Sequence, residues 1–128
     1  MNSEIYREII LEHYKNPTNA GTLENVDAIS RDSNPVCGDE IEIQIKFDDG
    51  KIENIKFQGQ GCAISQSSAD ILIDVVKNKD VTFIKDLTAE NFIKILGIEL
   101  SPLRLKCALL GLKALKTAVY TYLGTLPK

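Results

Sequence analysis

The sequence has no tryptophan, a single histidine and three cysteines among its 128 residues. Because aromatic residues make up only 6% of the chain, the core must be built mainly from aliphatic side chains. An odd number of cysteines argues against a closed set of disulfide bonds, and no two of them form a C-x-x-C pair. These absences disfavour a disulfide-stapled fold, a zinc ribbon and a thioredoxin-type redox motif.

Long apolar runs and blocks of basic residues are also missing. No run approaches the length of a membrane span, and the first residues lack the charged and apolar regions of a signal peptide. The formal charge of −3 gives no reason to expect nucleic acid or an anionic membrane as a partner. We therefore expect one domain, residues 1–128, that works in the cytoplasm as a monomer or weak homo-oligomer.

Known catalytic motifs are absent as well. There is neither a phosphate-binding loop nor the glycine fingerprint of a dinucleotide site. A cysteine nucleophile that needs a histidine partner could use only His13, which precedes every cysteine. His13 also lies on a packing face of the first predicted helix, so we expect a structural role for it.

Three strands are predicted in the first half of the chain. Residues 41–47 alternate apolar and polar side chains, which is typical of a strand with one buried face. A hairpin turn follows at 48–50, and the returning strand over 51–58 is expected to bulge near Glu53 and Asn54. Residues 28–31 are expected to add a third, antiparallel strand.

Helical patterns account for most of the rest. Capping residues and apolar spacing predict helices that end near residue 16 and that span about 65–77, 89–96 and 102–123. The sequence therefore predicts an α+β fold, a small three-stranded antiparallel sheet packed on one face by helices, with a long C-terminal helix.

The stretch Asn34-Pro35-Val36-Cys37-Gly38-Asp39 holds a thiol and a carboxylate two positions apart. Its proline and glycine predict a turn, so Cys37 and Asp39 can point into the same space. A soft thiolate beside a hard carboxylate is a pairing found among metal ligands and fills an apolar core poorly.

The other two cysteines also stand at special positions. Cys62 follows Gly59-Gln60-Gly61 and precedes a predicted helix, where the helix dipole and unpaired N–H groups favour a thiolate. Cys107 falls in the second turn of the last helix, beside Arg104 and Lys106, whose charges would stabilise a thiolate. A buried core cysteine is the alternative interpretation of Cys107.

Three thiolates and one carboxylate can complete a tetrahedral zinc site. The same four groups, Cys37, Asp39, Cys62 and Cys107, could instead hold a two-iron two-sulfur cluster. A carboxylate in the fourth position and a location at loop ends suit a cluster that is built and passed on. A binding module whose cysteines are only structural is the third alternative.

Four segments of the chain resemble the IscU/SufU/NifU-N family of iron–sulfur cluster assembly scaffolds, and the resemblance covers nearly the whole length. The segments are His13-Tyr14-Lys15-Asn16-Pro17, Asn34-Pro35-Val36-Cys37-Gly38-Asp39, Gly59-Gln60-Gly61-Cys62-Ala63-Ile64-Ser65 and Pro102-Leu103-Arg104-Leu105-Lys106-Cys107. The resemblance implies that the chain is a scaffold rather than an enzyme.

By this resemblance, Cys37, Asp39, Cys62 and Cys107 are the ligands of a transient 2Fe-2S cluster, or of zinc. A cysteine desulfurase would supply sulfur as a persulfide on one thiol, for which Cys107 is the candidate. Iron would join it, and the finished cluster would pass to acceptor apoproteins. The SufU branch implies an alternative role, that of a zinc-bound sulfur acceptor that stimulates a desulfurase.

Two departures from the family pattern concern the last segment. The IscU branch has histidine immediately before the third cysteine, whereas this chain has Lys106, which could pair with Asp39 or steady a thiolate. That feature resembles SufU, but the interval between Cys62 and Cys107 is too short for the SufU insertion. The run Leu100-Ser101-Pro102-Leu103-Arg104 also differs from the Leu-Pro-Pro-Val-Lys segment that bacterial IscU presents to its chaperone, so recruitment of a chaperone is not implied.

Overall fold

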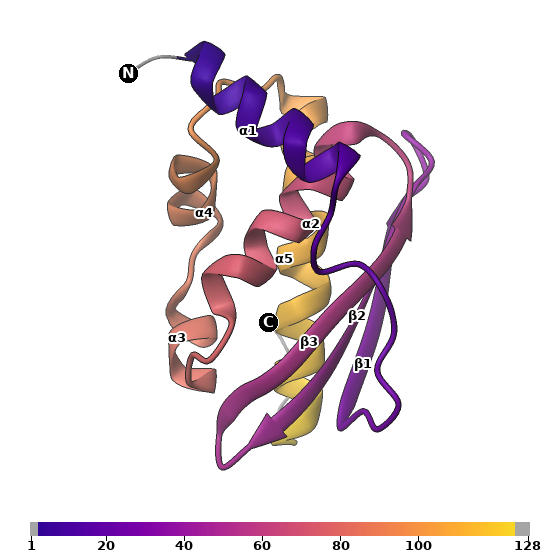
Figure 1. Ribbon diagram of the computed structural model, residues 1–128, viewed down its shortest axis with the longest axis vertical. Coiled ribbons are helices and arrows are strands. Elements are labelled where there is room, and N and C mark those ends of the chain that lie inside the picture. The colour runs from indigo at the N-terminus through magenta and orange to yellow at the C-terminus, as the bar shows by residue number, and fades with distance from the viewer. Residues whose placement is uncertain (1–2, 125–128) are drawn as a thin grey trace.

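The computed structural model, which describes residues 3–124, contains one antiparallel sheet of three strands in the order β1-β2-β3 (Figure 1). The strands are β1 (Ala28–Asn34), β2 (Asp39–Asp48) and β3 (Lys51–Gln60). The predicted α+β class is confirmed, and the third strand, β1, is longer than the sequence pattern indicated.

Apolar and polar side chains alternate along β2, and this alternation determines which face of the sheet is buried. Ile41, Ile43 and Ile45 are fully buried against the helices, because alternate side chains of a strand point to the same face. The β2–β3 turn has positive φ angles at Asp49 and Gly50, as expected for a two-residue hairpin turn. The predicted bulge is confirmed.

At the bulge, Lys46 pairs with Asn54 and Phe47 pairs with Ile52, so Glu53 has no partner across the ladder. This extra residue returns Ile52 to the buried face, where it is 1% exposed. The bulge therefore explains why Ile52 is out of step with Ile55 and Phe57 in the sequence.

Five helices follow or precede the strands within the described residues. They are α1 (Ser3–Lys15), α2 (Ala63–Val76), α3 (Val81–Asp86), α4 (Ala89–Leu96) and α5 (Pro102–Leu123). The predicted boundaries of α4 and α5 are confirmed: Thr88 and Ser101 cap their first turns, and Gly97 and Gly124 end them with positive φ. Helix α2 begins at Ala63, earlier than predicted, because Cys62 itself is the N-cap residue.

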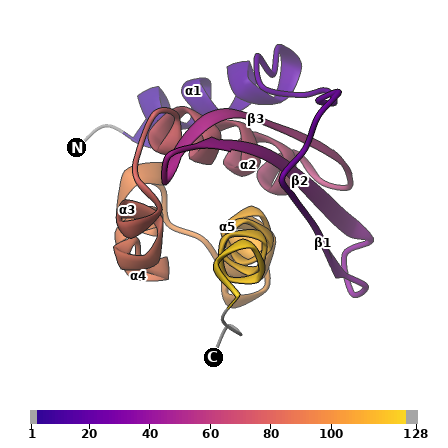
Figure 2. The same cartoon turned by 90° about the horizontal axis from the view of Figure 1, so that it is seen from below.

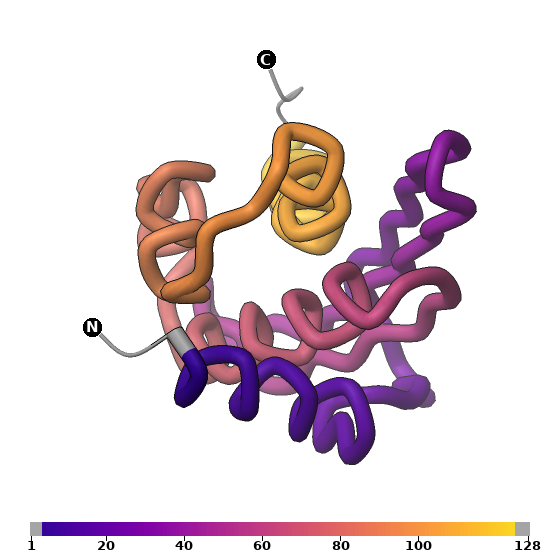
Figure 3. Tube along the Cα trace, turned by 90° about the horizontal axis from the view of Figure 1, so that it is seen from above, coloured from indigo at the N-terminus to yellow at the C-terminus, as the bar shows by residue number. Residues whose placement is uncertain are grey.

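The helices form layers on the concave face of the sheet. Figure 2 shows the sheet curving around α5, and Figure 3 shows α1 lying along α2 on the side away from α5. The largest fully buried side chains are Phe57, Phe92, Ile41, Ile43, Ile45, Ile52, Ile55, Leu72, Ile73, Ile84, Leu115 and Val76. Among the described residues, no helix combines the length and the apolar character that crossing a membrane requires.

Candidate metal centre

The turn between β1 and β2 carries the first two candidate ligands. Asn34 and Asp39 face each other across the ladder, and the Cys37 N–H donates to the Asn34 carbonyl at 3.2 Å. Gly38 has φ +70°, a conformation that a residue with a side chain rarely adopts. The turn therefore closes tightly and sets Cys37 and Asp39 together at one end of the sheet.

Cys62 reaches the same place from the end of β3. Its backbone N–H donates to Asp39 Oδ1 at 2.8 Å, and its Sγ lies 3.8 Å from Asp39 Oδ2. Gly61 makes this approach feasible, because its φ is +130° and a Cβ there would overlap the Asp39 carboxylate. The unpaired N–H groups at the start of α2 are thus partly used by a carboxylate from another strand.

Cys107 arrives from the second turn of α5 and is 0% exposed. Its thiol donates to the Leu103 carbonyl at 3.7 Å and accepts from Asn34 Nδ2 at 3.9 Å. The same thiol interacts with the side chains of Asp39, Cys37 and Cys62. The ligating atoms of Cys37, Asp39 and Cys107 all lie within 4.8 Å of one another.

The structure thus brings together all four residues that the sequence singled out as ligands. We call this group the thiol site (Cys37, Asp39, Cys62 and Cys107). Cys37 and Cys62 are partly exposed, whereas Asp39 and Cys107 form its buried floor.

Burial and hydrogen bonding act against each other on Asp39. Burial alone would raise the pKa of its carboxyl, but hydrogen bonds from the Cys107 thiol and from Cys62 hold that pKa below its ordinary value. For Cys107, burial raises the pKa of the thiol, and its hydrogen bond with Asp39 raises it further. The floor of the metal-free site is therefore a carboxylate beside a protonated thiol.

Arg104 is a cation that interacts with two of the thiols. Electrostatic attraction to Cys62 and a hydrogen bond with Cys107 raise the pKa of its guanidinium above the ordinary value. Lys106, which the sequence proposed together with Arg104 as a supporting cation, is exposed on α5. It lines a hollow of about 400 Å³ together with Ser33, Asn34, Leu109, Leu110 and Lys113.

Sequence reasoning did not name the residues that two neighbours of the thiol site contact. Asn34 donates to Cys107, and Gly61 makes room for Asp39. Both lie in segments that the sequence marked as turns, but a turn signal does not say which side chain it brings near a distant cysteine. The chemical donor set, three thiols and one carboxylate, fits both a tetrahedral zinc ion and an iron–sulfur cluster.

Comparisons with known proteins identify the family of the chain. The sequence profile of the NifU-like N-terminal domain matches residues 5–127. A zinc-dependent sulfurtransferase, SufU of Bacillus subtilis, is 35% identical over 137 aligned positions, which cover 90% of this chain and 89% of the relative. An iron–sulfur cluster assembly scaffold protein, IscU of Aquifex aeolicus, is 33% identical and covers 92% of this chain and 76% of its own length.

A solved structure has the same architecture. The crystal structure of FiSufU from Fervidobacterium islandicum, described as a cluster assembly scaffold for the SUF system, superposes with a TM-score of 0.78. The two chains are 31% identical, and the match covers 93% of this chain and 99% of the other. The shared fold thus extends over nearly all of both chains.

Proposed function

The chain belongs to the family of the NifU-like N-terminal domain, and on this premise we propose that it is a scaffold for iron–sulfur cluster assembly. The observation that carries the proposal is the convergence of three thiols and one carboxylate from three separate parts of the fold. The named activities of relatives, cluster assembly scaffold and zinc-dependent sulfurtransferase, support it.

The cluster is the cargo of this reaction. We propose that Cys37, Asp39, Cys62 and Cys107 hold a transient 2Fe-2S cluster, since thiolates are the usual ligands of such clusters. A carboxylate is a harder ligand than thiolate, so the position held by Asp39 keeps the cluster exchangeable. The partly exposed Cys37 and Cys62 leave a side from which an acceptor apoprotein can take it.

Sulfur reaches the site by thiol exchange with a cysteine desulfurase. The sulfur of Cys107 attacks the outer sulfur of the desulfurase persulfide, and the sulfur–sulfur bond of the donor breaks. The outer sulfur moves to Cys107, and the proton of Cys107 ends on the released donor thiol, so no external oxidant or reductant is needed. Arg104 stabilises the negative charge on the attacking sulfur.

The burial of Cys107 sets a condition on this step. Because Cys107 is 0% exposed, neighbouring groups must move away before a donor persulfide can reach it, and the side chain of Asn34, which donates to this thiol, is one of them. The acceptor thiol is identified by mass spectrometry of persulfides in single variants of each cysteine.

Anaerobic reconstitution tests the scaffold function. The metal-free protein receives ferrous iron, cysteine and a cysteine desulfurase, and its visible absorption spectrum is followed. We expect the bands of a two-iron two-sulfur centre in the wild type and in Val36→Ala, which changes the turn that carries Cys37 without removing a ligand. Cys37→Ala is expected to show none, and bands of equal strength in Cys37→Ala would contradict the ligand set.

A zinc-bound sulfur acceptor is the second candidate function. The observation that favours it is the position of Lys106, which lines an outer hollow and leaves the thiol site without the histidine of the IscU branch. Zinc on these ligands would hold thiolates deprotonated. We expect chelation of zinc to lower persulfide transfer from the desulfurase, and transfer unaffected by chelation would exclude this candidate.

The proposal also defines the setting in which the chain works. As a scaffold it needs a cysteine desulfurase and acceptor apoproteins, and it carries a group between them without a catalytic cycle of its own. We propose that it does so in the cytoplasm as a monomer or weak homo-oligomer. Gel filtration with light scattering, with and without the cluster, measures that oligomeric state.

A further inference from the structure

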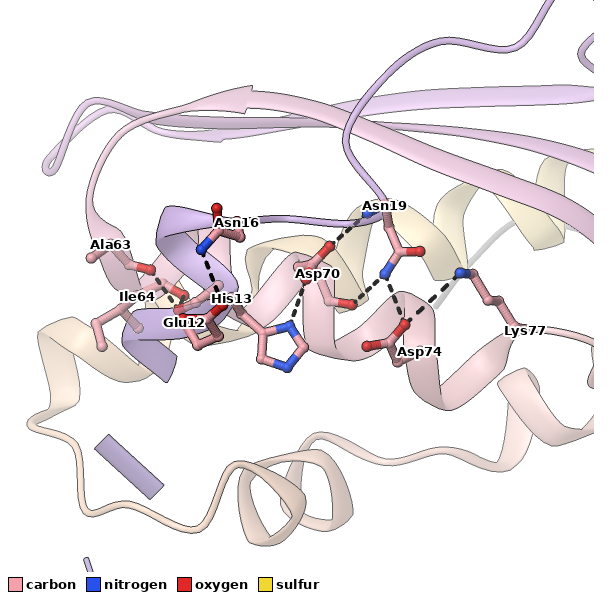
Figure 4. Close-up of polar contacts among 10 residues, drawn as sticks. Glu12, His13, Asn16, Asn19, Ala63, Ile64, Asp70, Asp74 and Lys77 are labelled. Carbon is pink, nitrogen blue, oxygen red and sulfur yellow. Dashed lines mark hydrogen bonds and ion pairs between the residues drawn. The ribbon is translucent and has the colours of Figure 1, made fainter. Parts of the chain in front are cut away.

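A second group of metal-ligating side chains lies between α1, the turn after it and α2. Figure 4 shows His13, Asn19, Asp70 and Asp74 facing one another there. His13 Nδ1 lies 2.5 Å from Asp70 Oδ2, and the Asn19 backbone N–H donates to Asp70 Oδ1 at 2.9 Å. We call these four residues the His13–Asp70 cluster.

Asp70 is the unusual member of the His13–Asp70 cluster, because its side chain is 0% exposed. The histidine side chain is 23% exposed and that of Asp74 is 46% exposed, so the cluster opens to solvent on one side only. A buried carboxylate is stable only when it is paired or bound to a cation. In this structure the His13 side chain and the Asn19 N–H provide the pairing.

The His13–Asp70 cluster contains more metal-ligating groups than a single ion pair requires. Ligating atoms of His13, Asp70 and Asp74 all lie within 4.8 Å of one another. One imidazole nitrogen and two carboxylates are ligands that divalent first-row metal ions accept. Their separations are close to those in a coordination shell, and small side-chain shifts would complete one.

An independent observation concerns Asn19, which is 0% exposed. Its Nδ2 donates both to the Asp70 carbonyl at 3.0 Å and to Asp74 Oδ1 at 2.9 Å. Its Oδ1 is buried and has no hydrogen-bond partner within residues 3–124. A buried acceptor without a hydrogen-bond partner is energetically unfavourable. Rotation of the amide would turn Oδ1 toward the same two oxygens, an arrangement that is stable only around a cation.

We propose that the His13–Asp70 cluster is a binding site for a divalent first-row metal ion, separate from the thiol site. The metal takes the place of the hydrogen between His13 Nδ1 and Asp70 Oδ2, and this hydrogen moves to Nε2 or to solvent as a proton. Asp74 and the rotated Asn19 amide supply further oxygen ligands, and water completes the shell on the open side. The step involves no oxidation or reduction.

The two sites differ in chemical preference and share no residue. Nitrogen and oxygen ligands bind first-row ions without sulfur, so the spectra of the two sites are distinguishable. Because the new site joins α1 to α2, its occupation would fasten the N-terminal helix to the rest of the fold.

Cobalt titration tests the site without interference from the thiols. In the variant with Cys37, Cys62 and Cys107 all changed to alanine, we expect Co²⁺ to bind with weak visible bands and without a sulfur-to-cobalt charge-transfer band. Asp74→Asn should raise the dissociation constant tenfold or more.

The matched control is Asp86→Asn, which changes an exposed carboxylate on α3 and should leave binding unchanged. No binding at submillimolar Co²⁺, or equal binding by the two variants, would show that the cluster is only an ion pair with hydrogen bonds.

If the triple variant fails to fold, the wild type gives the answer by NMR, since His13 is the only histidine. Zn²⁺ added beyond the capacity of the thiol site should shift the Nδ1 resonance of His13. An unchanged resonance would overturn the proposal.

Discussion

The thiol site and the His13–Asp70 cluster both gather polar groups around α2, and they are built in different ways. Contacts of the sulfur atoms span 3.7 to 3.9 Å. Those in the His13–Asp70 cluster span 2.5 to 3.0 Å. Sulfur is a weak hydrogen-bond partner, whereas charge-assisted bonds between nitrogen and oxygen are about twice as strong as neutral ones.

This difference separates two tasks of the same helix. The N-terminal end of α2 carries groups that can exchange weak contacts for a cargo, and its middle carries groups that hold α1 in place. Changes at the thiol site should therefore alter function more than stability, and changes at Asp70 should do the reverse. Four predictions, in order of decreasing effect, test this division.

The largest effect is expected for Cys37→Ala. Loss of this partly exposed thiol should abolish cluster formation, while the free energy of unfolding of the metal-free protein changes by less than about 1 kcal/mol. Visible absorption after reconstitution and urea denaturation measure the two quantities. A large loss of stability in this variant would mean that the thiol site also holds the fold together.

Next in size is the destabilisation expected for Asp70→Ala. The change leaves the Asn19 N–H without its carboxylate and His13 without its partner, so the free energy of unfolding should fall by about 3 kcal/mol. Urea denaturation of the metal-free protein measures it, with Asp86→Ala as an exposed control. At temperatures where Asp70→Ala is folded it should still assemble clusters, and failure to do so would break the separation of tasks.

A smaller, kinetic effect is expected for Asp39→Ala. Without the exchangeable carboxylate, loss of the cluster to a chelator should slow by a factor on the order of 10. The decay of visible absorption measures this rate, and Glu40→Ala, which changes the next residue of β2, is the control. Equal or faster loss in Asp39→Ala would remove the proposed role of this carboxylate.

The smallest effect concerns pH and the metal-free protein. Burial, and next its hydrogen bond with Asp39, raises the pKa of the Cys107 thiol, so the folded state keeps a proton that the unfolded chain loses near its ordinary pKa of 9.0. The resulting stabilisation is complete below pH 9 and is lost as pH rises above it, by about 1 kcal/mol per pH unit. Urea midpoints at pH 8 and 10 measure it.

Two variants isolate this contribution. Cys107→Ala should flatten the loss of stability at high pH relative to the wild type, and Cys37→Ala should keep it. The contribution of Asp39 to stability depends on pH in the opposite direction. The pKa of its carboxyl is held below 3.8, so this contribution is lost as pH falls through that lowered pKa. Equal slopes in both cysteine variants would contradict the assignment to Cys107.

Much of the fold follows from local patterns. The alternation around Ile43, the turn at Gly50 and the capping pair Ser101-Pro102 are each decided by neighbours in the sequence, and the structure has them where predicted. Helix α2 begins earlier than predicted because Cys62 occupies the N-cap position, although its side chain makes no capping hydrogen bond. Capping preferences favour serine there, so the sequence placed the start near Ser65.

The candidate site was predictable only in part, because its details depend on long-range geometry. Residue chemistry and family resemblance indicated Cys37, Asp39, Cys62 and Cys107. Because of the direction in which α5 runs, Arg104 reaches the thiols while Lys106 lines an outer hollow. Local sequence patterns do not predict that direction. Asp70 was missed because a carboxylate within a helix pattern normally indicates the solvent face.

The position of Cys107 in the last helix has a consequence for how the protein comes into being. As the chain leaves the ribosome, Cys37, Asp39 and Cys62 appear early, but the pocket has no floor until α5 has emerged and packed against β1 and β2. A nascent chain therefore exposes the thiols of Cys37 and Cys62 before the complete set of four ligands has formed. Completion of the site coincides with completion of the core, so only a finished molecule can carry cargo.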